Sequence, residues 1–171
     1  MKILIAEDDK NTLDSYKNIL ESRNHQVLIA EDGERCIQIY RQELDKLRNS
    51  DITSHPFYVV ILDYKIPKKD GLETAKEIFE LVPDQWIIFV SADTEIIRVD
   101  STKKLKHAVE ILQEPFSTDA FIDKVETREI FEQLETFGIH ISDLKDRIPS
   151  HKHLIKLLEE LIKVETKYFK Q

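Results

Sequence analysis

Acidic residues stand directly after two short apolar runs of this sequence, where the strands of a parallel sheet would end. Glu7 and Asp8 follow Ile3–Ala6, and Asp63 follows Tyr58–Leu62. Because the carboxyl ends of parallel strands meet at one edge of a sheet, we expect these carboxylates to converge in a shallow cleft. Like charges held a few ångströms apart repel each other, so such a cluster is costly unless a cation is bound.

The chemistry that such a cluster supports is metal-assisted phosphoryl transfer. Carboxylate oxygens suit Mg²⁺, which typically takes one or two carboxylates together with a substrate phosphate. A carboxylate beside Mg²⁺ can attack phosphorus and become an acyl phosphate, and the hydroxyl of Ser91 could hydrogen-bond a phosphoryl oxygen. In a plainer interpretation, Glu7, Asp8 and Asp9 only cap the following helix. Capping does not explain Asp63, so we favour the phosphoryl-transfer site.

Five short apolar runs must position these residues. They are Ile3–Ala6, Val27–Ala30, Tyr58–Leu62, Trp86–Val90 and Val109–Leu112. Three of the runs are almost continuously apolar, which is typical of strands covered on both faces. The segments between the runs carry apolar residues every three or four positions. This alternation predicts an α/β fold, a doubly wound five-stranded parallel sheet with helices on both sides.

The predicted helices differ in how clearly the sequence marks them. Asp70-Gly71 begins the third and Pro83 closes it, whereas residues 94–107 are weakly patterned and residues 49–56 are rich in turn formers. A fifth helix is expected from about Thr118 to Phe137. We therefore predict a first domain over residues 1–137, a connector over 138–149 and an amphipathic C-terminal helix over 150–171.

Composition limits the function classes. The net charge of −8 over 171 residues disfavours attraction to nucleic-acid phosphates. Cys36 is the only cysteine, which excludes an intrachain disulfide. The sequence runs directly into a strand rather than a charged leader, and no run approaches the ~18 apolar residues of a membrane helix. We expect a cytoplasmic protein without membrane contact.

Four segments together resemble the receiver domains of two-component response regulators. They are Ile3–Asp9, Val60–Gly71, Phe89–Ala92 and Glu114–Phe116, in unbroken order within residues 1–125. The resemblance implies a flavodoxin-like receiver fold that takes a phosphoryl group from a histidine kinase or a phosphotransfer protein. It also implies a signalling protein rather than an enzyme.

Carried over by position, the resemblance assigns the acidic residues and one backbone atom. Asp63 resembles the phosphoacceptor and Asp8 the direct Mg²⁺ ligand, while Glu7 is similar to the acid that holds metal-bound water. The backbone carbonyl of Lys65 resembles the third protein ligand. No organic cofactor is implied.

The remaining positions both match and depart from the family. Ser91 takes the place of the switch serine or threonine, and Ala92 is suitably small beside the phosphate. Glu114 stands where the family places a lysine before Pro-Phe. Each charge interaction there is worth roughly 4 kcal/mol at 4 Å with an effective dielectric of 20, so Glu114 cannot do the lysine's work. Ile111 stands where many members carry an aromatic switch residue.

Lys65 is a candidate substitute cation, because it lies two residues past Asp63. It could act at the phosphate or pair with Glu114, and the alternative is a solvated loop lysine. For Lys68 and Lys69 we expect solvated side chains.

The last helix carries a coiled-coil-like seam, formed by Leu154, Leu157, Leu161, Val164 and Tyr168. Leu158 and Ile162 widen the stripe, as in a helix docked on a globular surface. Homodimerisation and docking both remain open, and the heptad spacing slightly favours the dimer. Because only one helix is clear after residue 138, a helix-turn-helix DNA reader is the weakest hypothesis.

The preferred hypothesis is a receiver phosphorylated on Asp63 that signals through protein contacts. The alternative is a receiver-like interaction module that has lost phosphorylation. Glu114 and Ile111, which depart from the family pattern, support this alternative. A DNA-binding regulator is the third.

Overall fold

The computed structural model describes residues 1–49, 55–92, 109–139 and 151–169, with side chains of the last helix described over 154–163. The chain divides into two compact units, Met1–Phe116 and Ser117–Gln171. The predicted helix over 94–107, most of the loop over 49–56 and most of the connector over 138–149 lie outside the described residues. The predicted division into domains stays a prediction.

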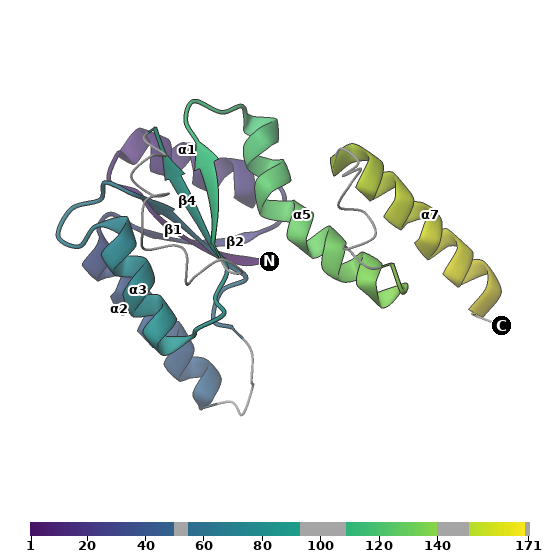
Figure 1. Cartoon of the computed structure of the whole chain (residues 1–171), viewed down its shortest axis with the longest axis horizontal. Coiled ribbons are helices and arrows are strands. Elements are labelled where there is room, and N and C mark those ends of the chain that lie inside the picture. The colour runs from purple at the N-terminus through teal and green to yellow at the C-terminus, as the bar shows by residue number, and fades with distance from the viewer. Residues whose placement is uncertain (50–54, 93–108, 140–150, 170–171) are drawn as a thin grey trace. The chain divides into compact units, whose positions relative to one another are not determined.

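The first unit is built on a five-stranded parallel sheet (Figure 1). Its strands are β1 (Lys2–Ala6), β2 (Gln26–Ala30), β3 (Val59–Asp63), β4 (Ile87–Ser91) and β5 (Val109–Gln113). They lie in the order β2-β1-β3-β4-β5, so the order reverses beside β1 and β3. The predicted α/β fold of receiver type is confirmed.

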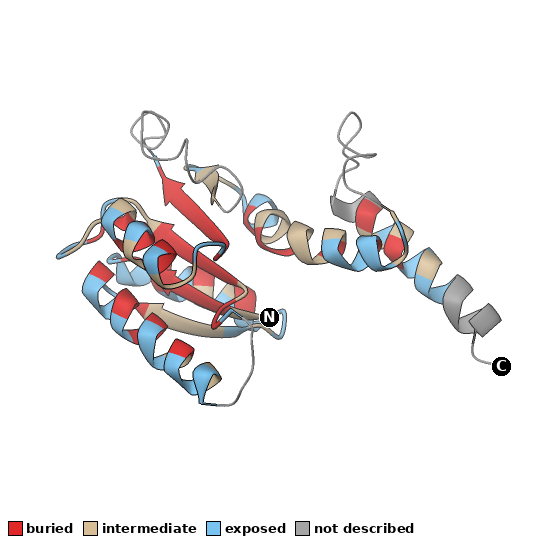
Figure 2. Ribbon diagram, turned by 60° about the horizontal axis from the view of Figure 1, so that its bottom comes forward, coloured by how far each residue is buried: buried red, intermediate tan, exposed pale blue. Residues whose placement is uncertain are grey.

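The helices of this unit cover both faces of the sheet. They are α1 (Lys10–Glu21), α2 (Gly33–Arg48) and α3 (Gly71–Leu81). Buried residues of α2 and α3 pack with Leu4, Val60 and Leu62 in one cluster, to which no residue of α1 belongs among those described. Since side chains alternate along a strand, Ile3 and Ile5 point to the opposite face. Figure 2 shows that β3 and β4 are buried almost throughout.

The register aligns the ends of the central strands. Ala6 of β1 pairs with Leu62 of β3, and Asp63 pairs with Val90 of β4. The residues that follow these pairs therefore emerge at one edge of the sheet. This edge is the one at which the acidic residues were predicted to meet.

Polar side chains cap the helices that begin at this edge. Asp9 caps α1 by accepting from the Thr12 N–H at 2.8 Å, and Asp32 caps α2. Asp70 and Glu73 form a reciprocal capping box on α3. These bonds satisfy backbone donors that have no partner inside the helix, so the sheet edge has well-defined helix starts.

The second unit contains α5 (Thr118–Thr136) and α7 (His151–Phe169). Ile130 and Leu134 of α5 form a buried cluster with Leu154 and Leu158 of α7. The last helix therefore packs on the second half of α5. Among the described residues, no helix combines the length and apolar content needed to cross a lipid bilayer.

Candidate functional site

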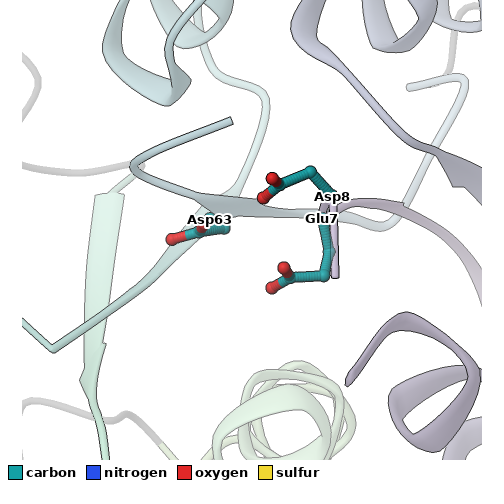
Figure 3. Close-up of side chains that lie close together, drawn as sticks. All are labelled: Glu7, Asp8 and Asp63. Carbon is teal, nitrogen blue, oxygen red and sulfur yellow. The ribbon is translucent and has the colours of Figure 1, made fainter. Parts of the chain in front are cut away.

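Glu7, Asp8 and Asp63 come together at the edge of the sheet. Each offers a carboxylate oxygen, and these oxygens all lie within 4.8 Å of one another (Figure 3). Glu7 is buried, Asp63 is half-buried and Asp8 is exposed. The convergence expected from the sequence is present, with two acids from the end of β1 and one from the end of β3.

Asp63 is the last residue of β3, and the backbone after it holds both its carboxylate and its main chain. The N–H groups of Tyr64 and Lys65 donate to the carboxylate and lower its pKa. Burial outweighs these bonds and raises the pKa of Asp63, and the charges of Asp8 and Glu114 raise it further. Two backbone N–H groups thus orient the carboxylate of Asp63, but they do not cancel the effect of burial on its pKa.

Gly71 fixes the path of this loop, a role that the sequence did not reveal. Its N–H donates to the carbonyl of Tyr64 at 3.0 Å, and a Cβ on Gly71 would lie 2.4 Å from the carbonyl oxygen of Asp63. No larger residue fits so close to that backbone. The sequence had marked Gly71 only as a helix start, and its signal was the Asp-Gly pair soon after Asp63.

Glu7 is the most buried of the three acids, with 7% of its surface exposed. Its Oε1 accepts a hydrogen bond from the N–H of Asp9 at 2.9 Å. Burial raises the pKa of Glu7 from 4.5 to about 7, although the bond from Asp9 opposes this and Asp63, Asp8 and Glu114 add to it. Asp9 is the residue that caps α1, so helix capping does not explain the presence of Glu7 and Asp8.

This donor set fits a hard divalent cation. All three side chains offer carboxylate oxygens, which Mg²⁺ prefers over the nitrogen and sulfur ligands of softer metals. Two of the acids have raised pKa values because negative charge gathers in a partly buried place. A bound cation would offset that charge.

Ser91 and Ala92 lie at the same edge. Ser91 ends β4 with 3% of its surface exposed, and its carbonyl accepts from the N–H of Glu114 at 3.0 Å. Ala92 is exposed. The structure places both beside the strand that carries Asp63.

Glu114 follows β5, and its carboxylate acts on the acidic cluster. Its charge contributes to the raised pKa values of Glu7 and Asp63. The Tyr16 hydroxyl donates to its Oε1 at 3.2 Å. Burial raises the pKa of Tyr16, and the charge of Glu114 raises it further. Periodicity along the sequence does not reveal this contact, because Tyr16 and Glu114 are 98 positions apart.

The three lysines of the loop after β3 differ in their ion pairs. Lys68 pairs with Asp32 at 2.7 Å, and its side chain is 57% exposed, as expected of a solvated lysine. Lys69 pairs with Glu77, and its side chain is 30% exposed. The side chain of Lys65 is exposed and makes no ion pair within the described part of the chain. The pair between Lys65 and Glu114 is therefore not formed here.

Comparison with known proteins identifies the first unit. The family model of the response regulator receiver domain matches residues 3–126. The transcriptional regulatory protein CpxR of Klebsiella pneumoniae is 29% identical over 98 residues, which are 57% of this chain and 37% of that protein. The chain thus spans little more than a third of this relative.

Solved structures agree on the fold. A receiver domain protein of Clostridium thermocellum has a TM-score of 0.59 at 23% identity, covering 75% of this chain and 95% of that one. A CheY-like receiver domain protein of Methanospirillum hungatei has a TM-score of 0.57 at 25% identity, covering 74% and 91%. The family match over most of the chain shows that it belongs to the response regulator receiver domain family of two-component signalling.

Proposed function

We propose that this chain accepts a phosphoryl group on Asp63 in the presence of Mg²⁺. The donor is a histidine kinase or a phosphotransfer protein, and the output passes through protein–protein contacts in the cytoplasm. The observation that carries the proposal is the convergence of Glu7, Asp8 and Asp63 oxygens within 4.8 Å of one another. Such a cluster is unfavourable without a cation.

The roles follow from where the residues lie. Asp8, Asp63 and the backbone carbonyl of Lys65 would hold Mg²⁺ directly, and Glu7 would hold it through water. The metal supplies positive charge that offsets charge on the transferred group.

Asp63 is the nucleophile. One of its carboxylate oxygens forms the new bond to phosphorus while the bond to the donor breaks. The backbone N–H groups of Tyr64 and Lys65 keep the carboxylate aimed. Ser91 donates its hydroxyl to a phosphoryl oxygen, and Ala92 leaves space for the group. The chain thus assists its own phosphorylation without turning over a substrate.

Glu114 supports a second candidate function, in which the chain signals without being phosphorylated. Its carboxylate adds negative charge where an anion would sit, and Lys65 does not approach it within the described part of the chain. A chain that cannot hold a phosphoryl group would be an interaction module that signals without phosphorylation. The name of CpxR as a transcriptional regulatory protein keeps DNA binding as a third candidate.

Beryllofluoride binding separates the first two candidates, because this anion forms an acyl-phosphate mimic on a metal-loaded aspartate. We expect calorimetry to show binding to the intact chain only when Mg²⁺ is present, and none to Asp63→Asn. Binding that is absent from the intact chain would favour the interaction module.

A homodimer through the last helix completes the proposal. Leu157 and Leu161 are only partly buried on α7, and Ile162 is 45% exposed. A second copy would cover the parts of these apolar side chains that remain exposed. Sedimentation of the intact chain and of Leu161→Glu tests this, and we expect the variant to be the lighter species.

A further inference from the structure

Glu114 is anchored at the phosphoacceptor edge by its own backbone. Its N–H donates to the carbonyl of Ser91 at 3.0 Å, which places it directly beyond β5 and beside the end of β4. Its negative charge is felt by both Asp63 and Glu7. The backbone of Glu114 therefore lies at the edge of the sheet where β3 and β4 end.

Tyr16 holds one oxygen of this carboxylate. Its hydroxyl donates to Oε1 of Glu114 at 3.2 Å. The ring has 7% of its surface exposed and stacks on Phe116 with the ring centroids 5.9 Å apart. Since the ring is packed in this way, the hydroxyl has little freedom to leave Glu114. The carboxylate is consequently oriented by a neutral donor.

The described residues leave the second oxygen of Glu114 without a hydrogen bond. Within the described part of the chain, Tyr16 is the one side chain that hydrogen-bonds this carboxylate. A carboxylate with one oxygen fixed and the other open can accept a proton from water. No lysine of the β3–α3 loop neutralises it, since Lys68 and Lys69 pair elsewhere.

Resting on the proposed phosphorylation of Asp63, we propose that Glu114 is the general base for hydrolysis of the aspartyl phosphate and that Tyr16 positions it. A water oxygen forms a bond to phosphorus while the bond from phosphorus to the Asp63 oxygen breaks. The electron pair of that bond returns to the Asp63 carboxylate. The water proton passes to Glu114 and then to solvent, and inorganic phosphate leaves. The chain would thereby limit the lifetime of its own phosphorylated state.

The test is the decay of phosphoryl label from chain loaded with a small phosphodonor and then freed of it. Glu114→Gln keeps the shape and the acceptor for Tyr16 but is a far weaker base. We expect it to slow hydrolysis by about 10- to 100-fold, at or below the lower end of what a positioned base supplies. The solvent deuterium isotope effect of the intact chain should also disappear in this variant.

Tyr16→Phe keeps the packed ring and removes the hydroxyl. We expect hydrolysis to slow by about 3- to 10-fold, because the base remains but loses its orientation. The double variant Tyr16→Phe with Glu114→Gln should decay no more slowly than Glu114→Gln alone. Such non-additivity shows that Tyr16 acts through Glu114 rather than through packing.

Tyr40→Phe is the matched control. The hydroxyl of Tyr40 is also buried and donates to a side chain, Oε1 of Gln85 at 2.8 Å, just before β4 begins. Its loss should lower the melting temperature and leave the decay rate unchanged.

The outcomes distinguish failure of the general-base role from failure of the proposed phosphorylation. If the intact chain takes no label, both the phosphorylation of Asp63 and the base role of Glu114 are contradicted. If it takes label and Glu114→Gln decays at the rate of the intact chain, the base assignment alone is overturned. If the effects of Tyr16→Phe and Glu114→Gln multiply in the double variant, the positioning role of Tyr16 is overturned.

Discussion

At the residue scale, the fold holds Glu7 and Asp63 in places that disfavour their charged forms. Desolvation is the largest cause for both, and neighbouring carboxylates add to it. A protein keeps such an arrangement at a cost in stability, and strongly perturbed acids tend to mark functional sites. The acidic residues could be found from the sequence because they follow apolar runs, whose ends define the sheet edge.

Glu7 makes metal-free stability depend on pH. The folded chain raises its pKa from 4.5 to about 7, so in this interval the folded state binds more protons than the unfolded state. Stability without metal should therefore fall as pH rises from about 4.5 to about 7, and Mg²⁺ affinity should rise over the same interval as Glu7 loses its proton.

Melting temperatures measured across that range with and without Mg²⁺ check both trends. Glu7→Gln should remove the contribution of this residue to each. A metal-free stability that increases across this interval by the same amount in the intact chain and in Glu7→Gln would contradict the assignment.

Replacing Glu114 by lysine should favour phosphorylation of Asp63, because it replaces a negative charge at this site with a positive one. Glu114→Lys would bring a cation next to the phosphoryl group. Each charge interaction is worth roughly 4 kcal/mol at 4 Å with an effective dielectric of 20 before screening. We expect faster labelling from acetyl phosphate, a longer-lived label, or both.

Lys65→Ala serves as the comparison, because Lys65 lies exposed beside Asp63 without an ion pair in the described part of the chain. It should leave beryllofluoride binding unchanged. Weaker binding in Lys65→Ala would show that this lysine moves to the anion when the anion is present.

At the element scale, periodicity predicted the strands and several helices but not the partners of the helices. The sequence left the last helix between a coiled-coil seam and a docked helix, because Leu154 belongs to the seam and Leu158 to the wider stripe. The structure buries both against α5. An apolar stripe specifies that a face is covered, and only the three-dimensional contacts specify by what.

The packing of α7 on α5 predicts unequal effects of truncation along one helix. Leu154 is 1% exposed and Ile162 is 45% exposed. Leu154→Ala should destabilise the second unit by about 2–5 kcal/mol, as loss of a buried leucine usually does. Ile162→Ala, its control, should change stability by about 0.5 kcal/mol or less. Hydrogen exchange at the amides of Ile130 to Leu134 measures both, and equal effects would mean that α7 does not dock through Leu154.

At the scale of the whole molecule, most of the fold was predictable because each strand has its own apolar run. In the described part of the chain, the runs of β1, β2, β3 and β5 are followed by helices. The contact of Tyr16 with Glu114 was not predictable, since it joins residues from opposite ends of the first unit. Gly71 was recognised as a helix start, but its closeness to the Asp63 backbone depends on how the loop folds back. Long-range contacts of this kind leave no periodic pattern in a sequence.

Removal of residues 150–171 tests what the terminal helix contributes to the molecule. Ile130 and Leu134 would lose their apolar partners, and each large side chain contributes roughly 1.5–3 kcal/mol when buried. Calorimetry should show a lower melting temperature for the second unit. Sedimentation of the same pair of chains reports whether the helix also joins two copies. A truncated chain with unchanged mass and unchanged melting would mean that the helix serves another partner.

The phosphoacceptor assignment is tested most directly by the intact mass of the chain after treatment with acetyl phosphate and Mg²⁺. The mass should increase by one phosphoryl group, and Asp63→Asn or Asp8→Ala should abolish the gain. Asp14→Asn, a change at an exposed aspartate of α1, should leave it intact. A gain that persists in Asp63→Asn, or its absence from the intact chain, would contradict the account.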